Sequence, residues 1–202
     1  MRMAPSLIWG KNMRSKKECR KEALARRALM SAKERETAGR RITDFLRDSE
    51  EYQLAEKILV YASYRDEVPT YDLIEGALRE GKQVFCPKIE GQAGARTMSF
   101  YRIMDPEELQ DGFQGIPEPV VLQGRHYETG KNSRDLILMP GTAFDRQRRR
   151  LGYGGGFYDR FCRRAQGAAR IALCFDCQLL EELPEEETDI RPERIVTESG
   201  WI

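Results

Sequence analysis

The segment with the clearest capacity for chemistry runs from Arg150 to Arg160 and reads Arg-Leu-Gly-Tyr-Gly-Gly-Gly-Phe-Tyr-Asp-Arg. Its glycines allow the backbone to approach a ligand closely and to adopt positive φ angles. A helix is expected over 158–165, and the free N–H groups at a helix start favour a phosphate. Asp159, in the first turn of that helix, can stabilise the helix dipole or hold a magnesium ion beside the phosphates. The segment therefore predicts a turn that binds phosphate.

A cluster of basic side chains lies directly before the glycines, and its members are Arg146, Arg148, Arg149 and Arg150. Planar guanidinium donors match the oxygens of a phosphate group. The segment is not a Walker A loop, because no Gly-Lys-Ser/Thr follows the glycines, and it lacks the G-x-G-x-x-G spacing of dinucleotide-binding proteins. The residues alone leave a second interpretation open, namely a flexible turn next to solvated arginines.

The elements that must position this turn are indicated by apolar patterning and by helix signals. Strands are predicted at 58–62, 83–89, 97–103, 135–139, 171–175 and 194–197. Four helices are predicted. The first covers 16–30, the second begins at a capping box at 31–34, the third runs from 69 to Gly81, which ends it, and the fourth covers 158–165. The strand at 97–103 suits an edge or hairpin position, and the segment 111–127, dense in Gly and Pro, is expected to be irregular.

Strands that alternate with helices predict an α/β protein with a largely parallel sheet flanked by helices, here with an N-terminal helical pair. In such sheets ligands bind beyond the carboxyl ends of the strands. The sequence contains no internal repeat and no low-complexity linker. We therefore expect one domain over 16–202, preceded by a dispensable extension over 1–15 in which Met13 is a possible true start.

The composition and net charge of the chain disfavour some classes of function. The chain has 202 residues, with 34 Lys and Arg against 33 Asp and Glu, and a formal net charge of +1. This balance argues against extensive binding to nucleic acid or to a membrane surface, since both need an excess of positive charge. No apolar run approaches the roughly 20 residues that span a bilayer. We expect a cytoplasmic protein, and a monomer because no dimer seam is visible.

The five cysteines and the single histidine do not indicate a metal centre. Cys174 and Cys177 have the C-x-x-C spacing, but a zinc site needs two further ligands. A chain of this length also needs no disulfides. We interpret the cysteines as structural or buried thiols, and we expect His126 to have a surface or structural role.

Two sequence blocks together resemble a known signature. The first is Pro140-Gly-Thr-Ala-Phe-Asp145, and the second is the glycine-rich segment extended to Phe161. In this order they resemble the signature of the 5-formyltetrahydrofolate cyclo-ligase family. Four shorter segments also resemble segments of the family, in the same order along the chain, although each match is individually weak. They are 16–20 with Arg27, 64–67 with 69–70, 115–119 and 195–198. The resemblance extends over roughly 16–198.

The resemblance implies an enzyme, a ligase that forms a C–N bond. It implies the conversion of 5-formyltetrahydrofolate to 5,10-methenyltetrahydrofolate, with ATP as co-substrate, Mg²⁺ as cofactor, and ADP and phosphate as further products. A formamide oxygen is a poor leaving group, so ATP is expected to phosphorylate it before nitrogen 10 attacks the activated carbon. The protein must then align the γ-phosphate with the formyl oxygen, neutralise charge and exclude water.

The resemblance also implies roles for particular residues. Catalytic roles fall to Arg150 and Asp159, and metal binding to Asp159 and Asp189. ATP binding falls to a larger set, namely Lys16, Lys17, Arg20, Arg150, Leu151, Gly152, Tyr153, Gly154, Gly155, Gly156, Phe157 and Tyr158. Folate binding is expected at Ala62, Glu67, Tyr153, Gly154, Gly155, Gly156 and Phe157. On the residues alone, Glu67 could instead cap the helix after Thr70.

The sequence departs from the family pattern at three positions. Arg148 replaces a usual glycine, Gln114 is inserted after Phe113, and Thr188 replaces a frequent histidine. Two functions of other classes stay open at this point. One is an RNA-binding protein that uses 146–150, which the charge balance and the lack of spaced aromatic residues disfavour. The other is a homologue that binds folate without converting it.

Overall fold

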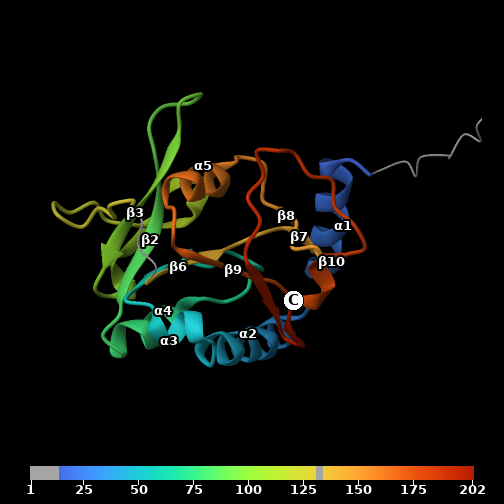
Figure 1. The fold of residues 1–202 in the computed structure, drawn as a ribbon, viewed down its shortest axis with the longest axis horizontal. Coiled ribbons are helices and arrows are strands. Elements are labelled where there is room, and N and C mark those ends of the chain that lie inside the picture. The colour runs from blue at the N-terminus through green and yellow to red at the C-terminus, as the bar shows by residue number, and fades with distance from the viewer. Residues whose placement is uncertain (1–13, 131–133) are drawn as a thin grey trace, which may run out of the picture.

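The computed structural model describes residues 14–130 and 134–202, and these form one seven-stranded sheet with helices on both faces (Figure 1). The strand order is β12-β11-β9-β6-β1-β2-β3. The bounds are β1 Lys57–Leu59, β2 Gln83–Glu90, β3 Thr97–Ile103, β6 Asp135–Met139, β9 Ala169–Leu173, β11 Arg194–Thr197 and β12 Gly200–Trp201. The five central strands are parallel, and the edge strands β3 and β12 are antiparallel to their neighbours. The predicted α/β class with a largely parallel sheet is confirmed.

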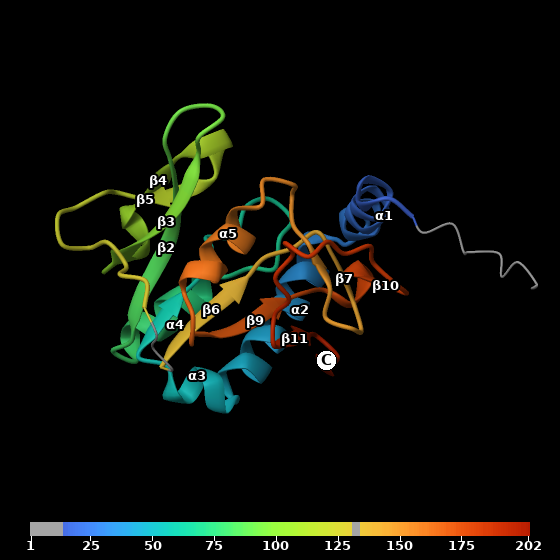
Figure 2. The ribbon, with the colours of Figure 1, turned by 45° about the horizontal axis from the view of Figure 1, so that its top comes forward.

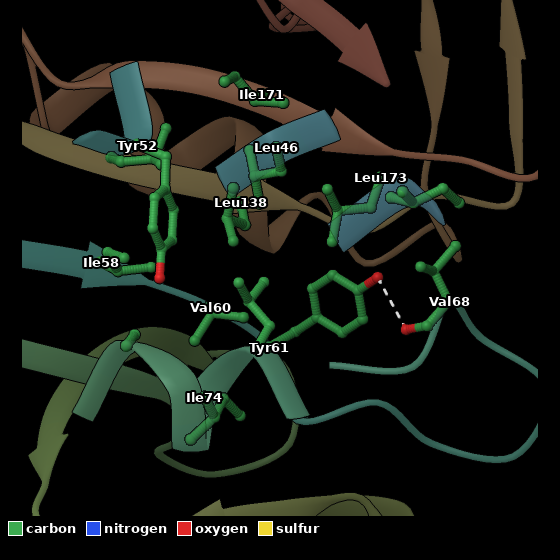
Figure 3. Close-up of a cluster of buried hydrophobic side chains, with 14 of the residues drawn as sticks. Leu46, Tyr52, Ile58, Val60, Tyr61, Val68, Ile74, Leu138, Ile171 and Leu173 are labelled. Atoms are coloured by element: carbon green, nitrogen blue, oxygen red, sulfur yellow. Dashed lines mark hydrogen bonds between the residues drawn. The ribbon is translucent and has the colours of Figure 1, made fainter. Parts of the chain in front are cut away.

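Apolar side chains alternate between the two faces of the central strands, and each face therefore has its own core. One core joins side chains such as Ile58 and Leu138 to the helices α2 (Ala32–Arg47) and α4 (Tyr71–Arg79). Figure 3 shows this core, where Tyr61 also donates a hydrogen bond to the carbonyl of Val68. The other core joins Leu59 and its neighbours to α5 (Phe157–Arg164). The short helix α3 (Glu50–Leu54) lies on the α2 side (Figure 1).

The two N-terminal helices are consecutive in the chain but pack on different parts of the molecule. Helix α2 covers the main sheet, whereas α1 (Lys16–Ala28) packs through Cys19 and Ala23 on a small three-stranded sheet (Figure 1). This small sheet consists of β10 (Leu179–Leu180), β7 (Ala143–Asp145) and β8 (Arg150–Leu151). The predicted helical pair is present, and its first member packs on the small sheet whose strand β8 leads directly into the glycine-rich segment.

Capping boxes fix the starts of both N-terminal helices. Ser31 and Glu34 form the predicted box before α2, and Ser15 with Glu18 forms a second box before α1. Each box satisfies two backbone donors that a helix start leaves without partners. Ser15 is thus part of the α1 cap. Residues 1–13 lie outside the described residues, and the expected dispensable extension stays a prediction.

Most element bounds agree with the sequence prediction, and the differences have local causes. Strand β1 ends at Leu59, because the following residues leave the sheet to form a loop at its carboxyl edge. Strand β2 contains Pro87, which the sheet tolerates because β2 pairs with β1 only over 83–85. Strand β9 lies two residues earlier than predicted, and β12 was not predicted.

The segment 111–127, expected to be irregular, contains regular structure at its start. The strands β4 (Leu109–Asp111) and β5 (Pro117–Pro119) pair in antiparallel fashion, beside the β2–β3 hairpin (Figure 2). Short 3-10 helices lie at Pro106–Glu108, Phe113–Gly115 and Asp176–Gln178. The inserted Gln114 has φ 59° and Gly115 has φ 76°, so the extra residue is accommodated in a tight left-handed turn between β4 and β5.

The cysteines behave as the sequence analysis expects. All five are free thiols; Cys174 is buried and Cys177 is half-buried. Burial raises the pKa of the Cys177 thiol to about 11, and raises that of Cys174 well above its ordinary value. A thiolate is the form that binds metals and attacks disulfides, so these thiols are poorly suited to either role.

Candidate active site

A large cavity of about 920 Å³ lies at the carboxyl edge of the parallel strands. Tyr61 and Ala62 enter it from the loop after β1, and Pro140 enters it after β6. Opposite walls come from α1, from the β2–β5 region and from the glycine-rich segment. This position agrees with the rule that ligands of α/β sheets bind beyond the carboxyl ends of the strands.

A second cavity of about 410 Å³ lies beside the first, and its lining is mainly polar and charged. Its positively charged side chains are Lys16, Arg20, Arg150, Arg160 and Arg163. Asp159, Glu186 and Asp189 add carboxylates. Four residues line both cavities, namely Arg150, Gly152, Gly156 and Asp159. These four form a shared wall, along which a molecule in one cavity lies beside a molecule in the other.

The glycine-rich segment takes backbone conformations that other residues rarely adopt. Gly154 has φ 103°, and Gly156 has φ 63° as the N-cap of α5. The N-cap Gly156 has no side chain that could cap this helix start. Its first N–H groups are therefore available to an anion beside the shared wall, where the helix dipole adds a partial positive charge.

Arg150 is the central cation of the shared wall. Its side chain is 3% exposed; Nη1 donates to the carbonyl of Pro140 (3.1 Å) and Nη2 to Oδ1 of Asp159 (2.8 Å). The same Asp159 oxygen accepts the backbone N–H of Ile190 (3.0 Å). The buried Nε atom of Arg150 has no hydrogen-bond partner among the residues that the structure describes. Arg150 therefore retains one donor without a protein partner.

The remaining predicted charges of the smaller cavity are paired with one another. Lys16 Nζ donates to Oδ2 of Asp189 (2.6 Å), and that oxygen also accepts the N–H of Glu186 (2.9 Å). Burial alone opposes ionisation of Asp189, but these hydrogen bonds together hold its pKa below the ordinary value. Arg20 Nε donates to the carbonyl of Gly152 (2.7 Å), so α1 is joined to the glycine-rich segment.

The donor set suits a hard cation bound together with phosphate. Asp159 and Asp189 both line the smaller cavity. Over 14–130 and 134–202, no cluster of three or more His, Cys, Asp or Glu side chains is arranged to hold a metal. Magnesium is commonly bound by one or two carboxylates together with substrate phosphates and waters. These two carboxylates fit that pattern.

Glu67 lies on the wall of the larger cavity, within a network that closes one side of it. Its carboxylate accepts the N–H of Tyr64 (3.0 Å) and the hydroxyl of Tyr153 (2.8 Å). Burial raises the pKa of Glu67. Arg27, 3% exposed, donates to both carboxylate oxygens of Asp66 and to the Tyr153 hydroxyl. Glu67 does not cap α4, since Thr70 is the N-cap.

The predicted residues divide between the two cavities. The smaller one contains Lys16, Arg20, Leu151 and Gly154; the larger one contains Ala62, Glu67, Tyr153, Gly155, Phe157 and Tyr158. Lys17 is exposed and lines neither cavity. Sequence reasoning assigned no role to the other charged lining residues, namely Arg27, Arg65, Asp66, Glu118, Arg160, Arg163 and Glu186. Glu118 was within the quoted 115–119 piece, but a carboxylate between two prolines carries no signal of burial.

The departures from the family pattern lie at different distances from this site. Arg148 lines neither cavity, and its guanidinium donates to the carbonyl of Glu193 (2.6 Å). Thr188 lines the smaller cavity, and its carbonyl accepts a hydrogen bond from Arg163. Arg148 therefore adds no cation to the site, whereas Thr188 lies within it.

The backbone at Arg148 gives a direct test of this departure. Arg148 has φ 64°, a left-handed conformation that costs a residue with a Cβ atom about 1 kcal/mol relative to glycine. We expect Arg148→Gly to unfold with a free energy about 1 kcal/mol higher than Arg148→Ala, since both variants lose the same side-chain contact. Urea titration of the two variants measures the difference. Equal stabilities would contradict the conformational argument.

The fold and the two joined cavities define the class: an α/β protein whose glycine-rich segment opens a helix beside a cluster of cations at the carboxyl edge of its sheet. The model of the 5-formyltetrahydrofolate cyclo-ligase family matches residues 12–198. The chain belongs to this family of ligases.

Individual relatives support the assignment. The chain is 35% identical over 148 residues to the 5-formyltetrahydrofolate cyclo-ligase of Escherichia coli K12, covering 72% of this chain and 80% of the relative. It is 32% identical over 166 residues to the probable 5-formyltetrahydrofolate cyclo-ligase of Caenorhabditis elegans, covering 77% and 79%.

Solved structures agree with the fold. The 5,10-methenyltetrahydrofolate synthetase of Aquifex aeolicus superposes with a TM-score of 0.78 at 32% identity, over 92% of this chain and 91% of that chain. The synthetase from Mycoplasma pneumoniae gives a TM-score of 0.71 at 19% identity, over 92% and 99%, and supports the fold alone.

Proposed function

We propose that the protein converts 5-formyltetrahydrofolate to 5,10-methenyltetrahydrofolate, with ATP as co-substrate and Mg²⁺ as cofactor. The observation that carries the proposal is the pair of cavities that meet at Arg150, Gly152, Gly156 and Asp159. A reaction between a nucleotide phosphate and a folate needs two adjacent pockets of different chemistry with one point of contact. Family membership supports the same reaction.

The smaller cavity suits the triphosphate of ATP. Its five positively charged side chains lie around the open start of α5, so cations and backbone N–H groups face the same space. Guanidinium groups and helix starts both favour phosphate oxygens. This arrangement supports the assignment of Lys16, Arg20, Arg150 and the backbone of 151–158 to ATP binding, while the exposed Lys17 lacks such support.

The larger cavity suits a folate. Its volume is within the usual range for a small-molecule site, and its lining combines aromatic rings with a few polar groups. Phe157 and Tyr153 offer flat faces for a ring, and the half-buried Glu67 offers an acceptor for ring N–H groups. We assign the pterin end of the folate to the side of the cavity that Ala62 and Glu67 line.

The reaction requires the formyl oxygen to attack the γ-phosphorus where the cavities meet, while the bond from this phosphorus to the bridging oxygen breaks and ADP leaves. Nitrogen 10 then forms a bond to the formyl carbon, the carbon–oxygen bond breaks, and phosphate departs with that oxygen and its electron pair. Arg150 is placed to neutralise negative charge on the transferring phosphoryl group, and the N–H groups at the start of α5 are placed to orient its oxygens.

Asp159 and Asp189 would hold the magnesium ion. When bound, the ion supplies positive charge to the phosphate oxygens. The residues themselves must first exchange partners, because Asp159 pairs with Arg150 and Asp189 with Lys16. Location in the cytoplasm and a monomeric state stay predictions of the sequence. In the described part of the chain, no helix has the length and apolar character needed to cross a membrane.

The test is the near-ultraviolet absorbance of methenyltetrahydrofolate in mixtures of purified protein, magnesium, ATP and 5-formyltetrahydrofolate. A rise that requires every component supports the proposed reaction. If folded protein binds both substrates without an absorbance rise, the protein is instead a folate-binding homologue without turnover. Oligonucleotide binding that depends steeply on salt and is unaffected by ATP would favour the RNA-binding alternative.

Glu67→Gln is expected to raise the KM for 5-formyltetrahydrofolate about tenfold and to leave the KM for ATP nearly unchanged, because a charged acceptor for ring N–H groups is lost. Since burial raises the pKa of Glu67, acidification should weaken folate binding in the wild type before ordinary glutamates titrate, and less so in the variant. Steady-state kinetics from pH 5 to 8 measures both effects.

Glu90→Gln is the matched control for this substitution. Glu90 also accepts a tyrosine hydroxyl, that of Tyr101 (2.7 Å), but it lines neither cavity. Its kinetics should equal those of the wild type. Equal effects of the two substitutions on the folate KM would remove Glu67 from the folate site.

A further inference from the structure

The hydroxyl of Tyr158 is buried and has no hydrogen-bond partner among the described residues. Other tyrosine hydroxyls with little or no exposure to solvent donate to a protein group, as Tyr61 does to Val68, Tyr52 to Glu80 and Tyr127 to Asp135. Buried hydroxyl groups in proteins are normally paired, because a lost hydrogen bond to water must be replaced. Tyr158 also lines the larger cavity, so a ligand bound there can supply the partner that its hydroxyl lacks.

The ring of Tyr158 is held in place by its neighbours. It packs edge-on against Phe100, with ring centroids 6.2 Å apart, and the guanidinium of Arg150 lies 5.9 Å from its centroid. Its side chain lines the larger cavity. The hydroxyl is therefore positioned before any ligand arrives, and its direction does not depend on a flexible loop.

The sequence position of Tyr158 places it next to the point where the cavities meet. It is in the first turn of α5, between Phe157 and Asp159, and Asp159 belongs to the shared wall. Burial, with Cys162 and Glu67 nearby, raises the pKa of Tyr158 well above its ordinary value. A tyrosine hydroxyl is in any case neutral near pH 7 and has one proton to donate.

We propose that the Tyr158 hydroxyl donates a hydrogen bond to the formyl oxygen of the folate, and that it holds this oxygen until it departs with phosphate. The inference rests on the proposed function. The formyl oxygen must lie where the two cavities meet, because it receives the γ-phosphoryl group there. Tyr158 lines the larger cavity beside this point, and its hydroxyl, like the Nε atom of Arg150, has no partner among the described residues. The neutral hydroxyl suits the neutral formyl oxygen, whereas the charge of Arg150 suits the phosphate.

The hydrogen bond matters most in the second half of the reaction. As the bond from nitrogen 10 to the formyl carbon forms, the carbon–oxygen bond breaks and its electron pair moves to the oxygen. The proton of nitrogen 10 leaves to the departing phosphate, and Tyr158 keeps its own proton. A fixed donor stabilises the charge that develops on the departing oxygen more than it stabilises the neutral formyl group, and this difference is catalytic.

Tyr158→Phe tests the proposal, because phenylalanine keeps the ring and its packing and removes only the hydroxyl. We expect turnover to fall about 100-fold, as on loss of one donor to a developing oxyanion, and the KM for ATP to change less than twofold. The midpoint of urea unfolding should stay the same or rise, since the hydroxyl has no partner to lose. Affinity for 5-formyltetrahydrofolate without ATP should fall several-fold.

Tyr127→Phe is the matched control, since its buried hydroxyl donates to Asp135 (2.6 Å) and lines neither cavity. It should lose stability and retain turnover. Turnover of Tyr158→Phe within twofold of the wild type, or a loss of stability like that of the control, overturns the proposal.

The same experiment separates this inference from the proposed function. If the wild type and Tyr158→Phe convert the folate at the same rate, the proposed function holds and only the role of the hydroxyl is overturned. If the wild type binds the folate without converting it, the proposed reaction is wrong. The affinities of the wild type and Tyr158→Phe for 5-formyltetrahydrofolate then still test the hydrogen bond, and equal affinities overturn it. A wild type that does not bind 5-formyltetrahydrofolate overturns both.

Discussion

Asp159→Asn is expected to lower turnover by about 100- to 1000-fold while the protein stays folded. Asn keeps an oxygen that accepts the N–H of Ile190 and faces Arg150, so the start of α5 retains its contacts. It loses the negative charge with which Asp159 would hold magnesium beside the transferring phosphoryl group, an effect worth several kcal/mol. Single-turnover rates at saturating ATP and folate measure the chemical step directly.

The control for Asp159→Asn is Asp72→Asn. Asp72 also lies in the first turn of a helix, α4, but it is exposed and lines neither cavity. A helix-dipole effect would appear in both variants, whereas a metal effect would appear only at Asp159. Higher magnesium should partly restore turnover of Asp159→Asn. Wild-type turnover in this variant would remove Asp159 from the site.

Arg150→Ala is expected to raise the KM for ATP by at least tenfold and to raise the KM for folate much less. Its guanidinium faces both cavities, but its charge complements phosphate and not a neutral formyl group. The substitution also leaves Asp159 without its ion-pair partner in a partly buried place. We therefore expect the free energy of unfolding to fall by about 2 kcal/mol.

Arg170→Ala controls for the loss of a partly buried guanidinium. Arg170 pairs with Glu193 (2.7 Å), and its Nε atom is likewise without a partner among the described residues, but it lines neither cavity. It should lose some stability and keep both KM values. A larger rise in the folate KM than in the ATP KM for Arg150→Ala would reassign Arg150 to the folate.

The sequence predicted the parallel core of the sheet because its strands are short, apolar and separated by clear helix signals. The strands at 135–139 and 194–197 have the predicted bounds, and the capping box at Ser31 starts α2 as expected. These features depend on local patterns, namely alternation, capping and breakers. The early end of β1 depends instead on which residues leave the sheet to line the larger cavity, and no local pattern encodes that choice. The shift of β9 has no such explanation, since no residue of 169–175 lines either cavity.

The candidate site also combines features that local sequence signals predict with features that depend on the tertiary fold. Glycines at 152 and 154–156 and the acidic helix start are local signals, and most residues expected near them line one of the cavities. Contacts between side chains far apart in the sequence could not be predicted from local patterns. Lys16 meets Asp189 and Arg27 meets Asp66 only because α1 packs on the small sheet, and the burial of Glu118 depends on its contacts with β2. The resemblance supplied the residue names, but not these partners.

The pairing of Lys16 with Asp189 and of Arg150 with Asp159 has a thermodynamic consequence under the proposed function. A phosphate that binds Lys16 and Arg150 releases two carboxylates, which repel it unless a cation arrives. A magnesium ion that binds the carboxylates releases two cations, which repel it unless a phosphate arrives. Each ligand thus neutralises the charges that the other has released from their ion pairs. Bound magnesium therefore raises the affinity for the phosphate, and by linkage bound phosphate raises the affinity for magnesium by the same factor. The site is thereby selective for the magnesium–nucleotide complex over either component alone.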